Sequence, residues 1–593
     1  MISVKDFLRE RRPIAVLAVL ILVLTTLPAI NIALVLGSNY QGIPPSFDDI
    51  FYLARVQSVV EGSYTIGNPY FYEHRNDAPL VVLAGIWLSA LPGLIGVPLL
   101  LSLFLNFILW SFVFALVLYW LFRELRAPPW LAVLATVVLF LGSYEHVWRS
   151  VNLQTVFPFY FLFYVALLRF IRVQSRTNIW MLAGATGASF YFYPYLWQMA
   201  GLTLALFILF GLVRKNWQFT KAALKASILG GIIGLPIPLY ILWLSHTSPY
   251  FWESMGRLGL VHTHLPMAEI VYSGGWIGVM LIFVALLYWR VKVLRDDLDF
   301  VRSAEFIAIS GLGMWLMEGS NLITGMLLET GEHVRLFIFP WLALASIAVA
   351  LLLYKHRAQI SGTVKVLSAI ALLILAIPPA HFFYGQLAPH LPAQVSQRQL
   401  GWEQQQSFAK PFAWLTENEK HSVVVWSDSR APFSNNLPIF TKHYTLYTYF
   451  GMLELVPEGE IRERYLISQY FDNPSVTDLM SDTKMGQYLG RRDLPHQAKT
   501  IERKIKICRI LFSWDKHKEC GTPSTPRSLL GVQFFVDLEK RFHDDIKPNI
   551  KVYLEKYHVS YILKDTAVDT QYRPQTLGAI LVYSDDRYEI WKL

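Results

Sequence analysis

The chain has 593 residues, of which 54% are hydrophobic and only 16% are charged, and its mean hydropathy is +0.38. A soluble protein of this length would carry charge on roughly a quarter of its residues. The composition therefore excludes an ordinary soluble enzyme and indicates a polytopic membrane protein. The net charge of +9 would suit a nucleic-acid-binding protein, but the positions of the basic residues argue against that function.

Apolar runs dominate the chain up to about residue 384. The first of them follows a basic stretch, as in a secretory signal, but it is too long for one and no small-residue cleavage site stands out, so we take it as a span. We predict eleven membrane spans, at residues 13–36, 97–122, 128–143, 154–171, 178–193, 196–213, 226–245, 272–289, 304–317, 336–354 and 363–384.

A further apolar stretch, residues 79–96, would place several basic loops outside if it crossed the membrane. We expect it to lie on the membrane or dip into it. The inner segments then carry twenty Lys and Arg residues, and the outer loops of the membrane domain carry five. By the positive-inside rule the amino terminus is cytoplasmic, and the basic excess is an orientation signal. An odd number of spans puts residues 385–593 outside.

Two domains follow from this division. Residues 1–384 form a helical transmembrane domain whose first outer loop is 37–96, and residues 385–593 form an extracytoplasmic domain large enough for its own core. We predict a mixed α/β fold for the second domain, with strands at 421–428, 559–565 and 588–593 and helix over 538–557. Its Cys508 and Cys520 could form a disulfide in an oxidising compartment, although two free thiols fit the sequence as well.

The outer loops are rich in acidic residues, whereas the spans carry almost no ionisable residue, which argues against an ion-coupled transporter. Acids from several loops can converge on one site at the membrane surface. The acids of the outer loops are Asp48, Asp49, Glu61, Glu73, Asp77, Glu145, Glu253, Glu269, Glu318, Glu329 and Glu332.

The first acidic pair is the strongest candidate within this set. Asp48 and Asp49 stand immediately before a predicted interfacial helix that ends near Gly62. One carboxylate can cap that helix. Because adjacent residues point to different sides, the second carboxylate can face a site.

Two short outer segments carry further candidates. Glu145, His146 and Arg149 lie together in one loop, either as a site or as a solvated turn with an ion pair between Glu145 and Arg149. The second segment, residues 332–335, ends at a span and contains Glu332, His333 and Arg335. An arginine there can bind a phosphate with two hydrogen bonds or serve as an interfacial anchor.

Two other patterns have simpler explanations. The aromatic cluster at 190–198 is typical of a membrane-interface belt, although such rings also stack on sugars and isoprenoid chains. His262 and His264 supply too few ligands for a metal site. The sequence has no Gly-rich nucleotide loop, zinc-protease helix or nucleophile elbow, which argues against ATP-driven transport.

A family resemblance rests on the stretch DDIFYLARVQSVVEG. Two acids followed by Tyr and an Ala-Arg pair, here Asp48, Asp49, Tyr52, Ala54 and Arg55, resemble the pattern of the GT-C class of membrane glycosyltransferases. Residues 73–96 resemble the juxtamembrane helix of that class, which does not cross the membrane. Where the mannosyl and lipid A branches often show Lys-Pro-Pro in the first loop, this chain has Asp77-Ala78-Pro79, so Arg75 or Arg335 would replace that lysine.

The resemblance implies a glycosyltransferase of the bacterial inner or plasma membrane that acts in glycan biosynthesis of the cell envelope. Such an enzyme transfers a sugar from a polyprenyl-phosphate donor to an extracytoplasmic glycan, lipid or protein, usually with inversion. Asp48 or Asp49 would be the catalytic base, and the arginines Arg335, Arg149 and Arg75 would bind the donor phosphate. The residues Glu145, His146, Glu332 and His333 would contact the acceptor or hold a divalent metal, Mg²⁺ or Mn²⁺.

Other functions remain open at this point. A lipid or polysaccharide flippase or a non-enzymatic assembly protein would have the same spans, but it leaves the clustered outer acids unexplained. A ligase or polymerase that uses a diphosphate-linked donor is a further alternative.

Overall fold

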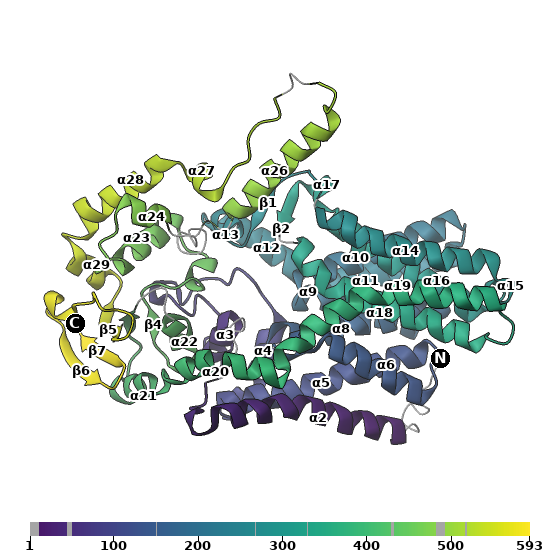
Figure 1. The fold of residues 1–593 in the computed structure, drawn as a ribbon, viewed down its shortest axis with the longest axis horizontal. Helices are drawn as coiled ribbons and strands as arrows, with labels where there is room; N and C mark the ends of the chain where they lie inside the picture. The colour runs from purple at the N-terminus through teal and green to yellow at the C-terminus, as the bar shows by residue number, and fades with distance from the viewer. Residues whose placement is uncertain are drawn as a thin grey trace.

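The computed structural model describes residues 11–43, 50–149, 151–266, 268–328, 330–427, 432–481, 491, 493–515 and 519–593. It is mostly helical and divides into an elongated helical bundle and a C-terminal region with a small sheet (Figure 1). The two described ends of the chain lie at opposite ends of the molecule. We call the end of the bundle that adjoins residues 385–593 its outer end.

Eight helices within the described residues are long and apolar enough to cross a membrane. At 1.5 Å per residue, 20 or more residues match a hydrocarbon core about 30 Å thick. These helices are α2 (Arg11–Leu36), α5 (Leu99–Glu124), α8 (Asn152–Arg172), α10 (Pro194–Val213), α14 (Ala268–Arg290), α16 (Leu298–Glu318), α18 (Thr330–Lys355) and α19 (Gly362–Leu387).

Every one of the eleven predicted spans coincides with helix, but the number eleven is not confirmed. The pair α11 (Trp217–Gly234) and α12 (Pro236–Thr247) is bent by 49°, and it makes a ninth crossing only if both count as one span. The remaining two predicted spans are α6 (Pro129–Gly142), with 14 residues, and α9 (Arg176–Phe192), with 17 residues. Prolines begin α6, and α9 contains Gly, Ser and Thr between its apolar residues, so neither reaches the length and hydropathy of a full span.

The segment expected not to cross forms only a short apolar helix, α4 (Ala84–Leu94). The predicted interfacial helix is also present, as α3 (Ile50–Val60). The remaining elements of the membrane half are α7 (Tyr144–Trp148), α13 (Phe251–Arg257), α15 (Lys292–Arg295), α17 (Asn321–Thr324), the turns η1 (Gly37–Asn39) and η2 (Tyr72–His74), and the antiparallel pair β1 (Leu260–His262) and β2 (Met326–Leu328).

The C-terminal region contains a five-stranded mixed sheet in the order β4-β3-β5-β7-β6. Strand β3 pairs in parallel with β4 and β5, whereas β7 pairs antiparallel with β5 and β6. The three predicted strands are confirmed as β3, β5 and β7, and β4 and β6 were not expected. The strands are β3 (Val424–Trp426), β4 (Tyr444–Thr445), β5 (Val559–Asp565), β6 (Ile580–Ser584) and β7 (Tyr588–Lys592).

Helices surround this sheet and connect it to the bundle. The helix predicted over 538–557 consists of the end of α28, a π-helical turn and α29. These elements are η3 (Ala388–His390), α20 (Pro392–Gln406), α21 (Ala409–Asn418), α22 (Pro432–Phe440), η4 (Gly451–Leu453), α23 (Glu458–Ser468), α24 (Val476–Ser481), α26 (Asp493–Leu511), α27 (Pro526–Leu530), α28 (Val532–Arg541), η5 (Phe542–Ile546), α29 (Ile550–Lys556) and η6 (Pro574–Leu577).

The first loop shares a hydrophobic core with the C-terminal region rather than with the bundle interior. Ile50, Leu53, Tyr70 and Phe71 are buried in one cluster with Trp426 and other residues of the C-terminal region. The bundle has a separate core built mainly from α5, α8, α10, α16 and α18. Residues 50–71 and the C-terminal region therefore pack as one body on the outer end.

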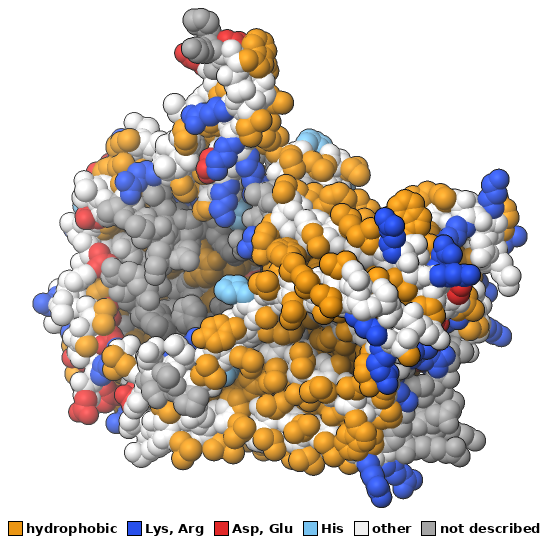
Figure 2. Space-filling model, turned by 45° about the vertical axis from the view of Figure 1, so that its right-hand side comes forward, with side chains coloured by type: hydrophobic (Ala, Val, Ile, Leu, Met, Phe, Trp, Pro, Cys, Tyr) orange, Lys and Arg blue, Asp and Glu red, His pale blue; other side chains and the backbone are white. Residues whose placement is uncertain are grey.

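Charge is distributed unevenly along the bundle. Figure 2 shows hydrophobic side chains over the visible face of the bundle and Lys and Arg side chains gathered at the end farthest from the C-terminal region. This basic end includes the exposed residues Arg290, Lys292, Arg295, Lys355 and Arg357. A belt of exposed apolar side chains bounded by charge is the surface expected of a protein that crosses a bilayer.

Candidate functional site

The helix that follows the acidic pair is attached to the outer end of the bundle. Asn152, the buried first residue of α8, donates a hydrogen bond from Nδ2 to the hydroxyl of Tyr52 at 2.9 Å. On the other side, the Tyr70 hydroxyl donates to the carbonyl oxygen of Ile50 at 2.9 Å. The first turn of α3 is thus held by both the bundle and the first loop.

The predicted catalytic residues Asp48 and Asp49 lie outside the described residues, as does the rest of 44–49. The residues that flank this segment are both buried. Ile43 packs with apolar residues of the C-terminal region, and its carbonyl oxygen accepts a hydrogen bond from Gln406 Nε2 at 2.6 Å. Ile50 belongs to the core shared by α3 and the C-terminal region.

Glu145, on helix α7, pairs with a histidine of η3 that the sequence did not reveal as its partner. His390 Nε2 lies 2.6 Å from Glu145 Oε2, and α7 packs against α19, which leads to His390. Burial alone would raise the pKa of Glu145, but the hydrogen bond and charge of His390, together with His146 and Arg398, lower it. Glu145 is therefore an ionised carboxylate held beside an imidazole.

The neighbouring His146 has a different environment. Its ring is 6% exposed and lies near the rings of Phe157 and Phe382, at centroid distances of 5.4 and 5.9 Å. Within the described parts of the chain neither ring nitrogen has a hydrogen-bond partner. Burial, and secondarily the charge of Arg149, lower the pKa of His146 to about 3. A buried neutral imidazole without partners is costly and is a candidate for contact with a ligand.

A second polar group lies on α10 and α18. The Tyr193 hydroxyl contacts His333 Nδ1, and the ring of Tyr195 stacks on His333 with centroids 4.5 Å apart. Phe337 packs against Tyr193 at 6.0 Å and against Phe157 at 5.8 Å. Because Phe157 also contacts His146, a continuous row of rings joins the two histidines across the outer end of the bundle.

The three candidate arginines lie in different surroundings. Arg149 is half-buried at the end of α7 and its charge acts on His146. Arg335 is exposed on α18, two residues after His333. Arg75 stacks on its neighbour Tyr72, 3.8 Å from the ring centroid, and donates to the Tyr72 carbonyl oxygen at 2.6 Å. The ring of Tyr72 in turn packs on Tyr444 of the C-terminal region.

The acids of the outer loops do not gather at one point within the described residues. Glu73 pairs with Arg464, and Asp77 lies 2.6 Å from His74, whose other nitrogen is 3.0 Å from Glu460. These pairs fasten the first loop to α23. Two others have separate partners: Glu253 accepts from the Glu458 backbone amide at 2.9 Å, and Glu318 accepts from Ser273 at 2.9 Å.

Arg55, part of the motif that carries the family resemblance, has a structural role. It is buried and forms an ion pair with Glu454, and its guanidinium lies 3.6 Å from the centroid of Phe51. Nearby, Arg257 donates to the carbonyl oxygens of Met452, Glu454 and Val456 at 2.7, 3.1 and 2.5 Å. These contacts fix α3 and α13 to the segment 452–456.

The described residues do not fit a divalent metal site. No three His, Cys, Asp or Glu side chains among them form a group that could hold a metal ion, whereas Mg²⁺ usually needs carboxylates grouped with water or phosphate oxygens. The carboxylate of Glu145 already pairs with the imidazole of His390. The side chain of Glu332, like Asp48 and Asp49, lies outside the described residues.

Sequence reasoning missed His390 and Asn152. His390 stands a few residues after the last predicted span, a position at the outer surface that could have drawn attention to it. Asn152 stands just before a predicted span and has no local signal, because only its contact with Tyr52, 100 residues away, makes it notable.

No protein-family model matches this chain, and no curated protein matches it. The resemblance of residues 48–55 to a glycosyltransferase motif therefore stands on those residues and on the arrangement of the bundle alone.

Proposed function

We propose that this protein is a membrane glycosyltransferase that moves a sugar from a polyprenyl-phosphate donor to an acceptor hydroxyl on the extracytoplasmic side. The eight apolar helices provide a surface for an isoprenoid chain. The C-terminal region and the first loop cover the outer end, where a lipid phosphate and a water-soluble acceptor would meet.

One observation carries the proposal: the hydrogen bond between Tyr52 and Asn152. It ties the first turn of α3, which directly follows Asp48 and Asp49 in the sequence, to the start of α8. The start of α8 adjoins α7 with Glu145, His146 and Arg149. The helix that directly follows the motif acids in the sequence and the polar residues of α7 therefore belong to neighbouring elements.

The proposed reaction is a single inverting displacement. A carboxylate of Asp48 or Asp49 takes the proton from the acceptor hydroxyl as its oxygen attacks the anomeric carbon. The bond between that carbon and the phosphate oxygen breaks, and the phosphate keeps the electron pair. The products are the glycosylated acceptor, the protonated carboxyl group and the polyprenyl phosphate.

Two arginines are suited to the negative charge that develops on the leaving phosphate. Arg149 lies at the outer end next to His146, and Arg335 is exposed on α18 near His333. The neutral imidazole of His146 can hydrogen-bond to a sugar or acceptor hydroxyl without bringing a further charge. Tyr193 and Tyr195 offer ring faces to which a sugar can stack.

Asp48→Asn and Asp49→Asn test the proposal. Full-length protein in lipid nanodiscs is given polyprenyl-phosphate-linked radiolabelled mannose, glucose or aminoarabinose with an envelope extract as acceptor. We expect the variant of the base to lose at least about 10²-fold in rate, the lower range for removal of a general base. Glu61→Gln is the matched control, since Glu61 is an exposed acid at the other end of α3.

Near-normal transfer by both Asn variants would reject the base assignment. If wild-type protein moves the lipid-linked sugar between leaflets without transferring it, the protein is a flippase and the proposal is wrong.

The orientation belongs to the same proposal: the amino terminus lies in the cytoplasm of a bacterial inner or plasma membrane and the C-terminal region lies outside. The basic end of the bundle supports it. Ser584 is exposed on β6, so Ser584→Cys should react with an impermeant maleimide added outside intact spheroplasts.

A further inference from the structure

A narrow arm leaves the C-terminal region beside the outer end of the bundle. It consists of α26 and the segment that returns from it toward α27, and α26 packs at its base on β1 (Figure 1). In Figure 1 the arm rises obliquely to the direction of the long helices. Its end projects from the molecule beside the outer end of the bundle.

The end of the arm is apolar and exposed. Trp514, Ile510 and Leu511 are 77%, 73% and 62% exposed, and Phe512 between them is also exposed. Soluble domains rarely leave large apolar side chains grouped in this way without a partner. We call the residues 510–514 the apolar tip.

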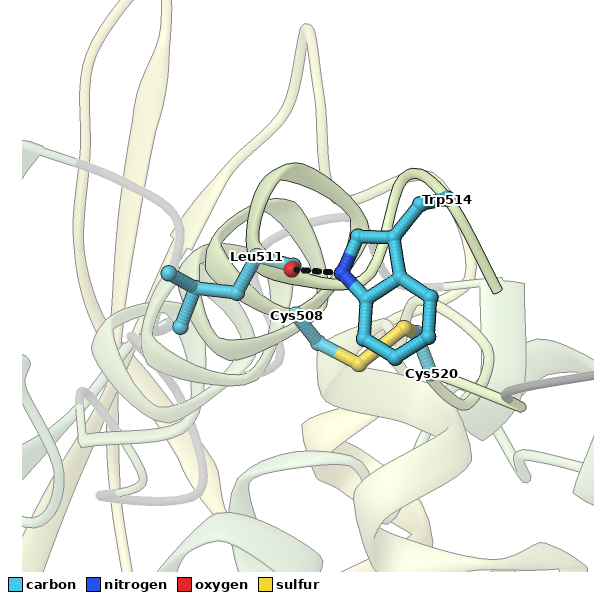
Figure 3. The surroundings of a disulfide bond; sticks show 4 residues. All are labelled: Cys508, Leu511, Trp514 and Cys520. Atoms are coloured by element: carbon cyan, nitrogen blue, oxygen red, sulfur yellow. Dashed lines mark hydrogen bonds between the residues drawn. A yellow bond between two sulfur atoms is a disulfide. The ribbon is translucent and has the colours of Figure 1, made fainter. Parts of the chain in front are cut away.

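A disulfide holds the tip in shape. Cys508 at the end of α26 is bonded to Cys520 on the returning segment (Figure 3). The indole of Trp514 lies beside this bond, and its Nε1 donates to the Leu511 carbonyl oxygen at 3.1 Å. The cross-link holds these apolar side chains in contact with water, which is unfavourable in free energy. Transfer of the tip into another apolar phase would remove that unfavourable term.

The helix that leads to the tip is basic. Residues 499–512 contain five basic residues and one acidic residue. Lys499, Lys504, Lys506 and Arg509 are exposed. Basic residues beside Trp and large aliphatic residues are the pattern of segments that lie in the interface of an anionic membrane.

We propose that this arm is an interfacial anchor: its apolar tip enters the outer leaflet beside the bundle while the basic residues of α26 contact anionic lipid headgroups. The arm would hold the C-terminal region, and the first loop packed with it, at a set height above the membrane. This inference depends on the bundle crossing a membrane, and its naming of the outer leaflet rests on the proposed orientation; it is independent of the proposed transferase activity.

A single fluorescent label tests the anchor. Because both cysteines are in the disulfide, Ser513→Cys provides one site for a bimane label between Phe512 and Trp514. Ser584→Cys, exposed on β6, is the matched control. Full-length labelled protein is reconstituted in vesicles of phosphatidylcholine alone or mixed with phosphatidylglycerol, each with and without a lipid carrying a shallow nitroxide quencher.

We expect the quencher to reduce emission at position 513 by at least about twofold in the vesicles that contain phosphatidylglycerol, as for a probe in the interface, and to leave position 584 unchanged. Replacing Lys504, Lys506 and Arg509 by Gln should weaken the quenching in those vesicles. Equal, weak quenching at 513 and 584 would overturn the proposal. A label at 513 that is shielded in detergent and released on dilution would overturn it too, since the tip would then bind a second copy of the chain.

Discussion

The buried ion pair between Arg55 and Glu454 offers the sharpest test of how α3 is held. Arg55→Met removes the guanidinium but keeps an unbranched apolar stem, and Glu454→Gln removes the carboxylate charge with little change of shape. Arg55 is 1% exposed and Glu454 is 3% exposed. Each single variant therefore leaves one charge buried without its partner.

The expected loss follows from that burial. Breaking a buried pair from one side typically costs about 3–5 kcal/mol. Burial raises the pKa of Glu454 although the charge of Arg257 opposes this, so the carboxyl group can take up a proton once Arg55 is removed. Arg55→Met should therefore fall near the lower end, at about 3 kcal/mol. In Glu454→Gln, Arg55 keeps its cation–π contact with the Phe51 ring, and that contact still contributes about 1 kcal/mol of stabilisation.

Thermal unfolding of the reconstituted full-length protein, followed by tryptophan fluorescence, measures the effect. For a domain of about 200 residues, 3 kcal/mol corresponds to a fall in Tm of about 6–12 °C. The double variant Arg55→Met with Glu454→Met should recover most of the loss, because it leaves no unpaired charge. Sugar transfer should fall in parallel with Tm if α3 positions the catalytic acid.

Lys506→Met is the matched control, since Lys506 pairs with Glu502 at 2.7 Å on the surface of α26. Because that pair is exposed to solvent, its loss should leave Tm unchanged within error. If Arg55→Met and Lys506→Met shift Tm equally, the buried pair does not hold α3 and the reasoning fails.

Three further predictions concern the first loop and the arm. Burial alone would lower the pKa of His74, but its two flanking carboxylates raise it from 6.5 to about 9. The stabilisation from protonated His74 is therefore complete below pH 6.5 and disappears as pH rises through 9. His74→Gln should flatten the decline in Tm over that range, and an unchanged decline would refute the assignment. Gly67→Ala would place a Cβ 2.1 Å from a backbone carbonyl oxygen and should lower the free energy of unfolding by about 1–3 kcal/mol. In the control Gly459→Ala the new Cβ has no heavy atom within 4 Å, so we expect no measurable loss of stability. Replacing Cys508 and Cys520 by Ser should remove about 2–3 kcal/mol of local stability, seen as faster hydrogen exchange at the end of α26; unchanged exchange would show that the disulfide does not hold the tip.

Much of the fold could be predicted because its signals are local. Apolar runs identified every long apolar helix, and charge in the flanking loops predicted that 79–96 does not cross, where the structure has only the short helix α4. Alternating apolar residues identified β3, β5 and β7. The two short segments α6 and α9 are helical as predicted, but their crossing of a membrane is not confirmed, because they have only 14 and 17 residues.

The candidate site was predictable only in part. Glu145, His146 and His333 were selected from their positions next to spans. The structure joins His146 to His333 through a row of aromatic rings, whereas Glu145 pairs with His390. The role of Arg55 was not foreseen, because its partner Glu454 is 399 residues away. His390 was missed for the same reason, since it lies 245 residues from Glu145.

The sequence by itself determined that the chain has helices long and apolar enough to cross a membrane, where those helices run and which half carries the sheet, since hydropathy and periodicity act over a single turn or strand. Only the tertiary structure decided which outer acids fasten the first loop, which histidine is buried without a hydrogen-bond partner among the described residues and where the disulfide-linked arm extends. The reason is physical: the energy of a charged or polar side chain depends on the burial and on the partners that the fold brings to it, and those partners lie hundreds of residues away.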